Sequence, residues 1–176
     1  FKKAENSISL VTLPYSQDLA PDWETFKTNA NALYKLNSQG KIAAMYPVGA
    51  GGIAEALAKM ALGNRIGAAV RMIPQSATRA ELGGEVGAED LFTPLYGSII
   101  VESDQALDGI EDFVEDTVVK IGLTTEEKSL NLFGKSIDLA KIERVWEEKL
   151  SVVFPPVSGA GEQEPLEQWA KDVHPS

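Results

Sequence analysis

The sequence AMYPVGAGGIAEALAKM, residues 44–60, passes from an apolar run through four small residues into an alanine-rich segment. Residues 41–46 are short and apolar, which predicts a buried strand, and apolar side chains recur at helical spacing over residues 53–62. The small residues between them, Gly49–Gly52, therefore join a strand to a helix. A unit of this kind is typical of folds in which helices pack on a sheet.

The same patterns continue on both sides of this unit. Short β-favouring runs predict strands at residues 7–13, 65–72, 97–103, 118–123 and 129–133. Helical spacing predicts a helix from Asp22 to residues 37–40, further helices over 106–116 and 136–150, and a helical turn at 88–92. The predicted fold class is therefore α/β (α+β), with helices packed on a mixed sheet.

Two of the predicted helices carry specific side-chain expectations. Asp22 and Asp138 stand where a carboxylate would cap the first turn of a helix. Trp23 and Trp146 fall on the apolar positions of these helices, so we expect both indole rings in the core.

Length and charge limit the classes of protein that fit. A chain of 176 residues with 44% hydrophobic content can bury one core, and we expect one domain over residues 1–150 followed by a linker at 151–176, which holds four of the nine prolines. The formal charge of −10 opposes binding to nucleic acid or to an anionic membrane. No apolar run approaches the roughly 20 residues of a membrane span, so a cytoplasmic protein is expected.

Several kinds of catalytic site lack the residues that they need. The sequence has no cysteine, and its only histidine is His174 near the C-terminus. Thiolate nucleophiles, zinc sites with thiolate ligands and Ser-His-Asp triads are therefore not expected, and we assign no catalytic and no metal-binding residue. Glu55 and Lys59, four positions apart on one helix, are predicted to form a solvated ion pair.

The glycine bend has two explanations. Amide groups at a helix start lack intrahelical partners, and glycines let the backbone approach a ligand, so the bend can bind an anion. The alternative is that small residues only let the helix pack closely. The bend matches neither a dinucleotide-binding motif nor a P-loop. The candidate ligand-binding residues are Val48, Gly49, Ala50, Gly51 and Gly52.

A long segment without periodicity follows the third predicted strand. Residues 74–87 are rich in Gly, Ser, Thr and Glu and predict a long mobile loop. Four charged residues lie in or beside it: Arg71, Arg79, Glu81 and Glu85. Loops of this length are more often functional or disordered than neutral, and we expect disorder in the isolated chain.

The stretches KIAAMYPVGAGGIAEALAKMALGNRIG (41–67) and VVKIGLTTEEKSLNLFGKSIDLAKIERVWEEKL (118–150) carry a family resemblance. Over roughly residues 1–150 the chain resembles the C-terminal domain of the aminoimidazole ribonucleotide synthetase superfamily. It is most similar to the second such domain of the long single-chain phosphoribosylformylglycinamidine synthases. The resemblance implies partial ferredoxin-like topology and makes residues 151–176 the linker toward a glutaminase domain.

The resemblance also implies an activity for the full-length protein. Those enzymes use ATP, glutamine and magnesium ions to convert the amide of formylglycinamide ribonucleotide to an amidine in de novo purine biosynthesis. The implied partners are an N-terminal ATP-binding domain and the glutaminase domain of the same chain. The bend would face the cleft toward the ATP-binding domain. The fragment alone is expected to be inactive, to bind neither ATP nor magnesium, and to self-associate through its exposed cleft face.

The bend departs from the family pattern. Many members have a His-Asp pair before the glycines and an acidic residue within the bend, where this chain has Met45-Tyr46-Pro47 and Val48-Gly49-Ala50. In the long enzymes one half is a degenerate copy that holds a nucleotide for structural reasons, so the resemblance implies an auxiliary role here. The alternative is a phosphate- or nucleotide-binding module of another member, such as selenophosphate synthetase or thiamine-monophosphate kinase.

Overall fold

The computed structural model describes residues 1–16, 18–74 and 87–149. The chain forms two compact units, Phe1–Glu143 and Arg144–Ser176. The first unit contains the whole sheet and is described below. In the second unit, an ion pair joins Arg144 Nε to Glu148 Oε1 at 3.7 Å. The predicted loop at 74–87, apart from its two end residues, and the predicted linker at 151–176 lie outside the described residues.

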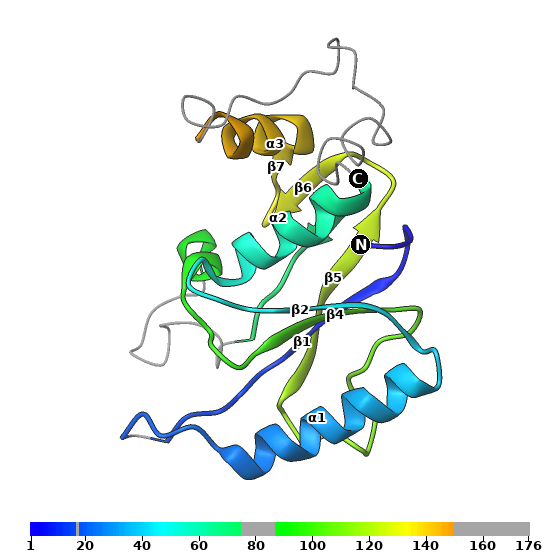
Figure 1. Cartoon of the computed structure of the whole chain (residues 1–176), viewed down its shortest axis with the longest axis vertical. Coiled ribbons are helices and arrows are strands. Elements are labelled where there is room, and N and C mark those ends of the chain that lie inside the picture. Colours follow the sequence, from blue (N-terminus) through cyan, green and yellow to red (C-terminus); the bar gives the residue numbers. More distant parts are fainter. Residues whose placement is uncertain (17, 75–86, 150–176) are drawn as a thin grey trace, which may run out of the picture. The chain divides into compact units, whose positions relative to one another are not determined.

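Seven strands form one mixed sheet in the order β2-β4-β1-β5-β3-β6-β7. The strands are β1 (Ser7–Val11), β2 (Ile42–Pro47), β3 (Gly67–Val70), β4 (Ile99–Ser103), β5 (Val118–Thr125), β6 (Ser129–Leu132) and β7 (Lys135–Asp138). The helices are α1 (Trp23–Ser38), α2 (Gly52–Asn64), the 3₁₀ helix η3 (Ala88–Phe92) and α3 (Leu139–Glu148). Figure 1 shows these elements along the chain.

The first strand occupies the middle of the sheet. β1 pairs antiparallel with β4 on one side and with β5 on the other. β2 also pairs antiparallel with β4, so β1 and β2 are parallel with β4 between them. Together with α1, these strands make the split β-α-β unit of ferredoxin-like folds. The carboxyl ends of the parallel strands β1 and β2 lie at the same edge of the sheet, so the segments that follow these two strands begin close together.

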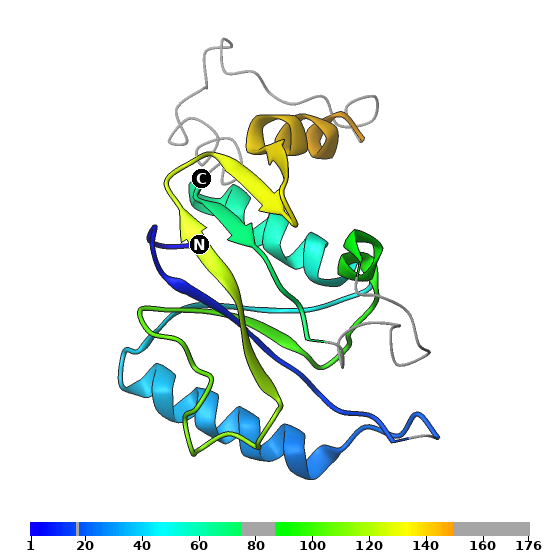
Figure 2. The ribbon, with the colours of Figure 1, turned by 180° about the vertical axis from the view of Figure 1, so that it is seen from behind.

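Helices cover both faces of the sheet. Ile100 packs in the cluster that contains most apolar side chains of α2, whereas Val101 packs in the cluster around α1. Successive residues of a strand point to opposite faces, so α1 and α2 lie on opposite sides of β4. Figure 1 shows the two helices on either side of β1, β2 and β4, and Figure 2 shows the same arrangement from behind. The predicted α+β class with a mixed sheet is confirmed.

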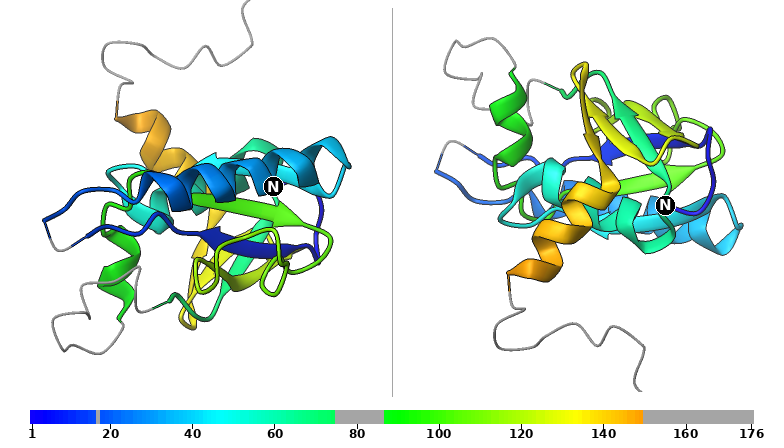
Figure 3. Two further views of the ribbon diagram at one scale, coloured as in Figure 1. Left: turned by 90° about the horizontal axis from the view of Figure 1, so that it is seen from below. Right: turned by 90° about the horizontal axis from the view of Figure 1, so that it is seen from above.

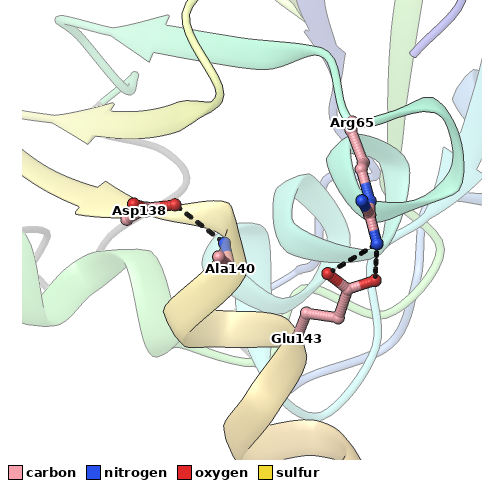
Figure 4. Close-up of polar contacts among 4 residues, drawn as sticks. All are labelled: Arg65, Asp138, Ala140 and Glu143. Atoms are coloured by element: carbon pink, nitrogen blue, oxygen red, sulfur yellow. Dashed lines mark hydrogen bonds and ion pairs between the residues drawn. The ribbon is translucent and has the colours of Figure 1, made fainter. Parts of the chain in front are cut away.

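Helix ends are fixed by the two predicted caps. The Thr25 amide and hydroxyl donate to the Asp22 carboxylate at 3.1 and 2.7 Å. At α3, the Ala140 amide donates to Asp138 Oδ1 at 2.8 Å, as Figure 4 shows. Figure 4 also shows Arg65, the C-terminal cap of α2, whose Nη2 lies 2.7 and 3.0 Å from the Glu143 carboxylate oxygens. This ion pair joins the end of α2 to the start of α3.

The chain before β1 is held by a buried carboxylate. Glu102 in the middle of β4 has no solvent-exposed surface. The amides of Lys2 and Lys3 and the side-chain amide of Asn6 donate to it at 2.8 to 3.0 Å. These hydrogen bonds tie the segment before β1 to β4.

Two predicted elements were assigned wrongly. Residues 106–116 form no helix, because successive i→i+3 turns, such as Ile110 N to Leu107 O and Phe113 N to Ile110 O, use the same apolar spacing. The positive φ of 86° at Gly109 also interrupts any helix. Three of the four residues of strand β7 fall within the predicted last helix, 136–150. No strand was predicted there, because all four residues are exposed and show no apolar alternation.

The two tryptophan predictions were also wrong. Trp23 is 63% exposed and Trp146 is 52% exposed. The α1 face that packs on the sheet carries two polar residues, Thr25 and Asn29, beside Ala32, Leu33 and Leu36. Asn29 Nδ2 donates to Thr117 Oγ1 at 2.9 Å, and Asn29 Oδ1 accepts from the Val114 amide at 3.0 Å. These hydrogen bonds hold Asn29 on the face of α1 that packs on the sheet, so Trp23 faces solvent.

Candidate functional site

The glycine bend connects the carboxyl end of β2 to the start of α2. Val48 is 2% exposed, and its amide donates to the Ser98 carbonyl at 2.8 Å, which fixes the bend to the segment before β4. Gly49 and Gly51 are half-buried, whereas Ala50 is exposed. The middle of the bend is therefore the part that an external ligand can reach.

Gly52 has a structural role of its own. Its φ is +68°, a left-handed conformation that side chains other than that of glycine rarely adopt. A Cβ there would collide with the Leu91 carbonyl oxygen and would lie 2.7 Å from Phe92 C and 2.8 Å from Thr93 O. Close packing of α2 against the backbone at the end of η3 thus requires glycine at this position. This packing requirement at Gly52 does not test the predicted ligand-binding role of the other bend residues.

Four amides at the start of α2 could take part in anion binding. The Gly51 amide donates to Glu55 Oε2 at 3.0 Å, and the Gly52 amide donates to the Gly49 carbonyl at 3.2 Å. The amides of Ile53 and Ala54 have no acceptor among the residues that the structure describes. Unpaired amides at a helix start are the groups that bind anions in other proteins.

An internal carboxylate already stands at this helix start. Glu55 Oε1 lies 2.7 Å from Lys59 Nζ, so the predicted ion pair is confirmed. Lys59 Nζ also lies 5.7 Å from the centre of the Tyr46 ring. The hydrogen bond from Lys59, followed by that from the Gly51 amide, lowers the pKa of Glu55. The hydrogen bond to Glu55, followed by that to Tyr46, raises the pKa of Lys59.

This arrangement determines what the bend can do chemically. Glu55 stays ionised and neutralises Lys59, so an external phosphate must displace the Glu55 carboxylate from the Gly51 amide or bind beside it. Among the described residues, no group of three or more His, Cys, Asp or Glu side chains could hold a metal ion. The described part of the chain also contains no helix that could cross a bilayer. The bend offers amides and no group that can move a proton.

The other charged residues that the sequence analysis singled out do not lie in the bend. Arg71 is exposed and lines an open groove of about 720 Å³ along β5 and β3, together with Lys120 and Leu123. Arg79, Glu81, Glu85 and His174 lie outside the described residues.

The sequence interpretation missed a second surface at the end of unit 1 where β1 finishes. Tyr15, Leu19 and Tyr96 are 47%, 80% and 58% exposed and line a groove of about 580 Å³. These residues lie in segments that were predicted to be loops, where the sequence shows neither helical nor strand periodicity. A signal was nevertheless present, because large apolar side chains in loops between polar residues often mark interaction sites.

The comparisons with known proteins agree with this fold. Residues 6–135 match the domain family described as AIR synthase related protein, C-terminal domain. No curated protein sequence matches the chain.

Solved structures with a similar fold include PurL of Thermotoga maritima. The complex of that protein with AMPPCP matches at a TM-score of 0.60 and 15% identity, over 80% of this chain and 26% of that chain. Its complex with FGAR matches at a TM-score of 0.59 and 13% identity, over 80% and 28%. A HypE–HypF complex matches at a TM-score of 0.50 and 13% identity, over 77% and 52%.

The TM-scores and identities show what this chain has in common with these solved structures. At such low identities the structures show a common fold, and this chain spans only about a quarter of the PurL chains. The family match rests on the sequence itself and covers more than half of the chain, the 130 consecutive positions from residue 6 to residue 135. The chain therefore belongs to the family of AIR synthase related proteins, as their C-terminal domain.

Proposed function

We propose that this chain is the second C-terminal domain of a long single-chain phosphoribosylformylglycinamidine synthase. The full-length protein would be an ATP- and glutamine-dependent carbon-nitrogen ligase of cytoplasmic de novo purine biosynthesis. Support comes from the family match and from the likeness to structures of PurL complexed with AMPPCP, ADP and FGAR. The domain boundary at residue 150 and the linker at 151–176 belong to this proposal.

Within that enzyme the domain has an auxiliary role. The observation that carries this proposal is the bend itself, where Ala50 is exposed and the amides of Ile53 and Ala54 lack acceptors within the described part of the chain. The bend would complete a nucleotide-binding cleft whose other side is an N-terminal ATP-binding domain. Because Glu55 and Lys59 at the start of α2 form an ion pair with each other, the bend contributes hydrogen bonds and no chemistry.

The described residues can bind the phosphates of ATP, but they offer no site for a magnesium ion. The phosphates of a nucleotide could accept from the bend amides once Glu55 leaves Gly51, and the nucleotide would supply the group that activates the substrate amide in the full-length enzyme. Magnesium has no cluster of carboxylates here among the residues that the structure describes. We therefore assign the metal ligands to the neighbouring domain.

The test compares the full-length protein with the chain of residues 1–176. Full-length protein is expected to convert formylglycinamide ribonucleotide with ATP and glutamine, whereas the shorter chain is expected to show no turnover and no micromolar binding of ATP or ADP by calorimetry. An inert full-length protein would exclude the assigned reaction. Micromolar nucleotide binding by the shorter chain would favour an independent binding module instead.

A matched pair of variants tests the bend. Ala50→Glu places a carboxylate at the exposed centre of the bend, and Ala140→Glu adds the same charge at an exposed position of α3. In the full-length protein, the increase in melting temperature caused by ADP and magnesium should be lost in the first variant and kept in the second. Equal shifts in both variants would remove the bend from the nucleotide site.

A further inference from the structure

Large apolar side chains gather where β1 ends and α1 begins. We name this surface the aromatic edge and define it by the following residues: Tyr15, Leu19, Trp23, Phe26 and Tyr96. Their exposed fractions run from 37% for Phe26 to 80% for Leu19. Figure 3 shows the loop between β1 and α1 reaching the left-hand end of unit 1 in both views. Exposed patches of this kind mark interaction sites more often than scattered single residues do.

The aromatic edge is held in place by local contacts. The Tyr15 hydroxyl donates to the Tyr96 carbonyl at 3.0 Å, which joins the loop after β1 to the segment before β4. The rings of Trp23 and Phe26 meet edge to face, with centroids 6.0 Å apart. An isolated bridge pairs Tyr15 with Pro21. A surface fixed in this way loses little conformational entropy when a partner binds.

A groove lined by Tyr15 and Tyr96 adds negative charge to this surface. The groove holds about 580 Å³, and among the described residues that line it only Glu115 and Asp116 are charged. Both carboxylates are exposed, and neither forms an ion pair with any residue in the described ranges. Asp116 has a φ of 60°, so the backbone adopts the left-handed conformation where its side chain borders the groove. Apolar walls beside these two carboxylates suit a side chain with an apolar chain and a cationic end, such as lysine or arginine.

We propose that the aromatic edge and its groove bind a partner protein surface that presents apolar side chains next to lysine or arginine. Charge complementarity selects this occupant, because the described residues that line the groove include two carboxylates and no basic side chain. A second copy of this chain is disfavoured, since each copy carries a charge of −10 and would bring carboxylates against carboxylates. Nucleic acid is disfavoured for the same reason. The inference does not depend on the proposed enzyme.

The partner is unidentified, so the test uses a defined probe. The probe is a synthetic amphipathic helix of leucine and lysine, and its control has glutamate in place of lysine. Amide shifts of the isotopically labelled chain should change at Tyr15, Tyr96 and residues 115–117 with the lysine peptide only. Raising the salt concentration should weaken binding, because the charges involved are exposed.

Variants separate this groove from general attraction to an acidic protein. Glu115→Gln with Asp116→Asn should raise the Kd about three- to tenfold, as expected for two exposed ion pairs. Asp108→Asn with Glu111→Gln removes the same charge from the same segment, outside the groove lining, and should leave the Kd within about twofold. Circular dichroism and urea unfolding would verify that all variants fold.

The apolar part of the surface has its own control. Trp23→Ala should raise the Kd about fivefold or more, as for a buried aromatic anchor. Tyr34→Ala removes another exposed aromatic ring of α1, 74% exposed and not part of the aromatic edge, and should have no effect. Equal losses in both charge variants, shift changes centred elsewhere, or dimers that form through Trp23 in sedimentation would each overturn the proposal.

Discussion

Replacing Gly52 with alanine tests how the bend is packed. The left-handed conformation, with a φ of +68°, costs a residue with a Cβ about 1–2 kcal/mol. The added methyl would also press on backbone atoms 2.7 and 2.8 Å away, in Phe92 and Thr93, which cannot move as a flexible side chain would. Overpacking of this kind costs about 1–3 kcal/mol more. The Gly52→Ala variant should therefore lose about 2–5 kcal/mol of unfolding free energy.

Gly63 provides the control within the same helix. Its backbone has no positive φ, and no heavy atom lies within 4 Å of an added Cβ. Alanine there should stabilise the chain by about 0.5–1 kcal/mol, because glycine weakens helices. Urea unfolding of residues 1–176, followed by circular dichroism, measures both variants. A Gly52→Ala variant as stable as the unchanged protein would refute the packing of η3 against α2 described above.

Three further substitutions, the last with a control at an exposed leucine, test other contacts. Glu102→Gln should cost about 2–3 kcal/mol, because the amide nitrogen of glutamine cannot accept from the part-buried Lys2 amide, and urea unfolding with hydrogen exchange at that amide measures this. Glu55→Gln should remove a stabilisation that depends on pH: the folded-state pKa lies below the ordinary 4.5, so the contribution is present above pH 4.5 and is lost as the pH falls through the folded value. The stability difference between this variant and the unchanged protein should therefore be larger at pH 7 than at pH 3. Leu57→Ala, at a fully buried position, should cost about 2–5 kcal/mol, whereas Leu19→Ala, at a position 80% exposed, should change stability by less than about 0.5 kcal/mol.

The parts of the fold with strong local signals could be predicted from the sequence. Six of the seven strands have short apolar or β-branched runs, and β2, the bend and α2 follow directly from their periodicity. Asp22 and Asp138 cap the helices that they were predicted to cap, because capping depends only on neighbouring backbone groups. β7 gave no such signal: its Lys135–Asp138 side chains are all exposed, and its pairing depends on the hairpin at Phe133 and Gly134, both with positive φ.

Long-range contacts account for the remaining differences. Trp23 is exposed because Asn29 finds partners 85 and 88 positions away, and periodicity within α1 contains no information about them. Turns over residues 106–116 use a three-residue apolar spacing that a helix would also produce. At the bend, the sequence indicated the Glu55–Lys59 pair and the exposed backbone. It did not indicate that the Glu55 carboxylate would accept from the Gly51 amide, which depends on the rotamer of one side chain.

The central place of β1 has a consequence for biosynthesis. The strand leaves the ribosome before both of its neighbours in the sheet, and the bond between Asn6 and Glu102 spans 96 positions. At roughly 5–20 residues per second, translation delays these partners by about 5–20 seconds. During that interval the apolar residues of Ser7–Val11 have no sheet to join. The nascent chain is thus expected to need shielding by a chaperone until β4 and β5 emerge.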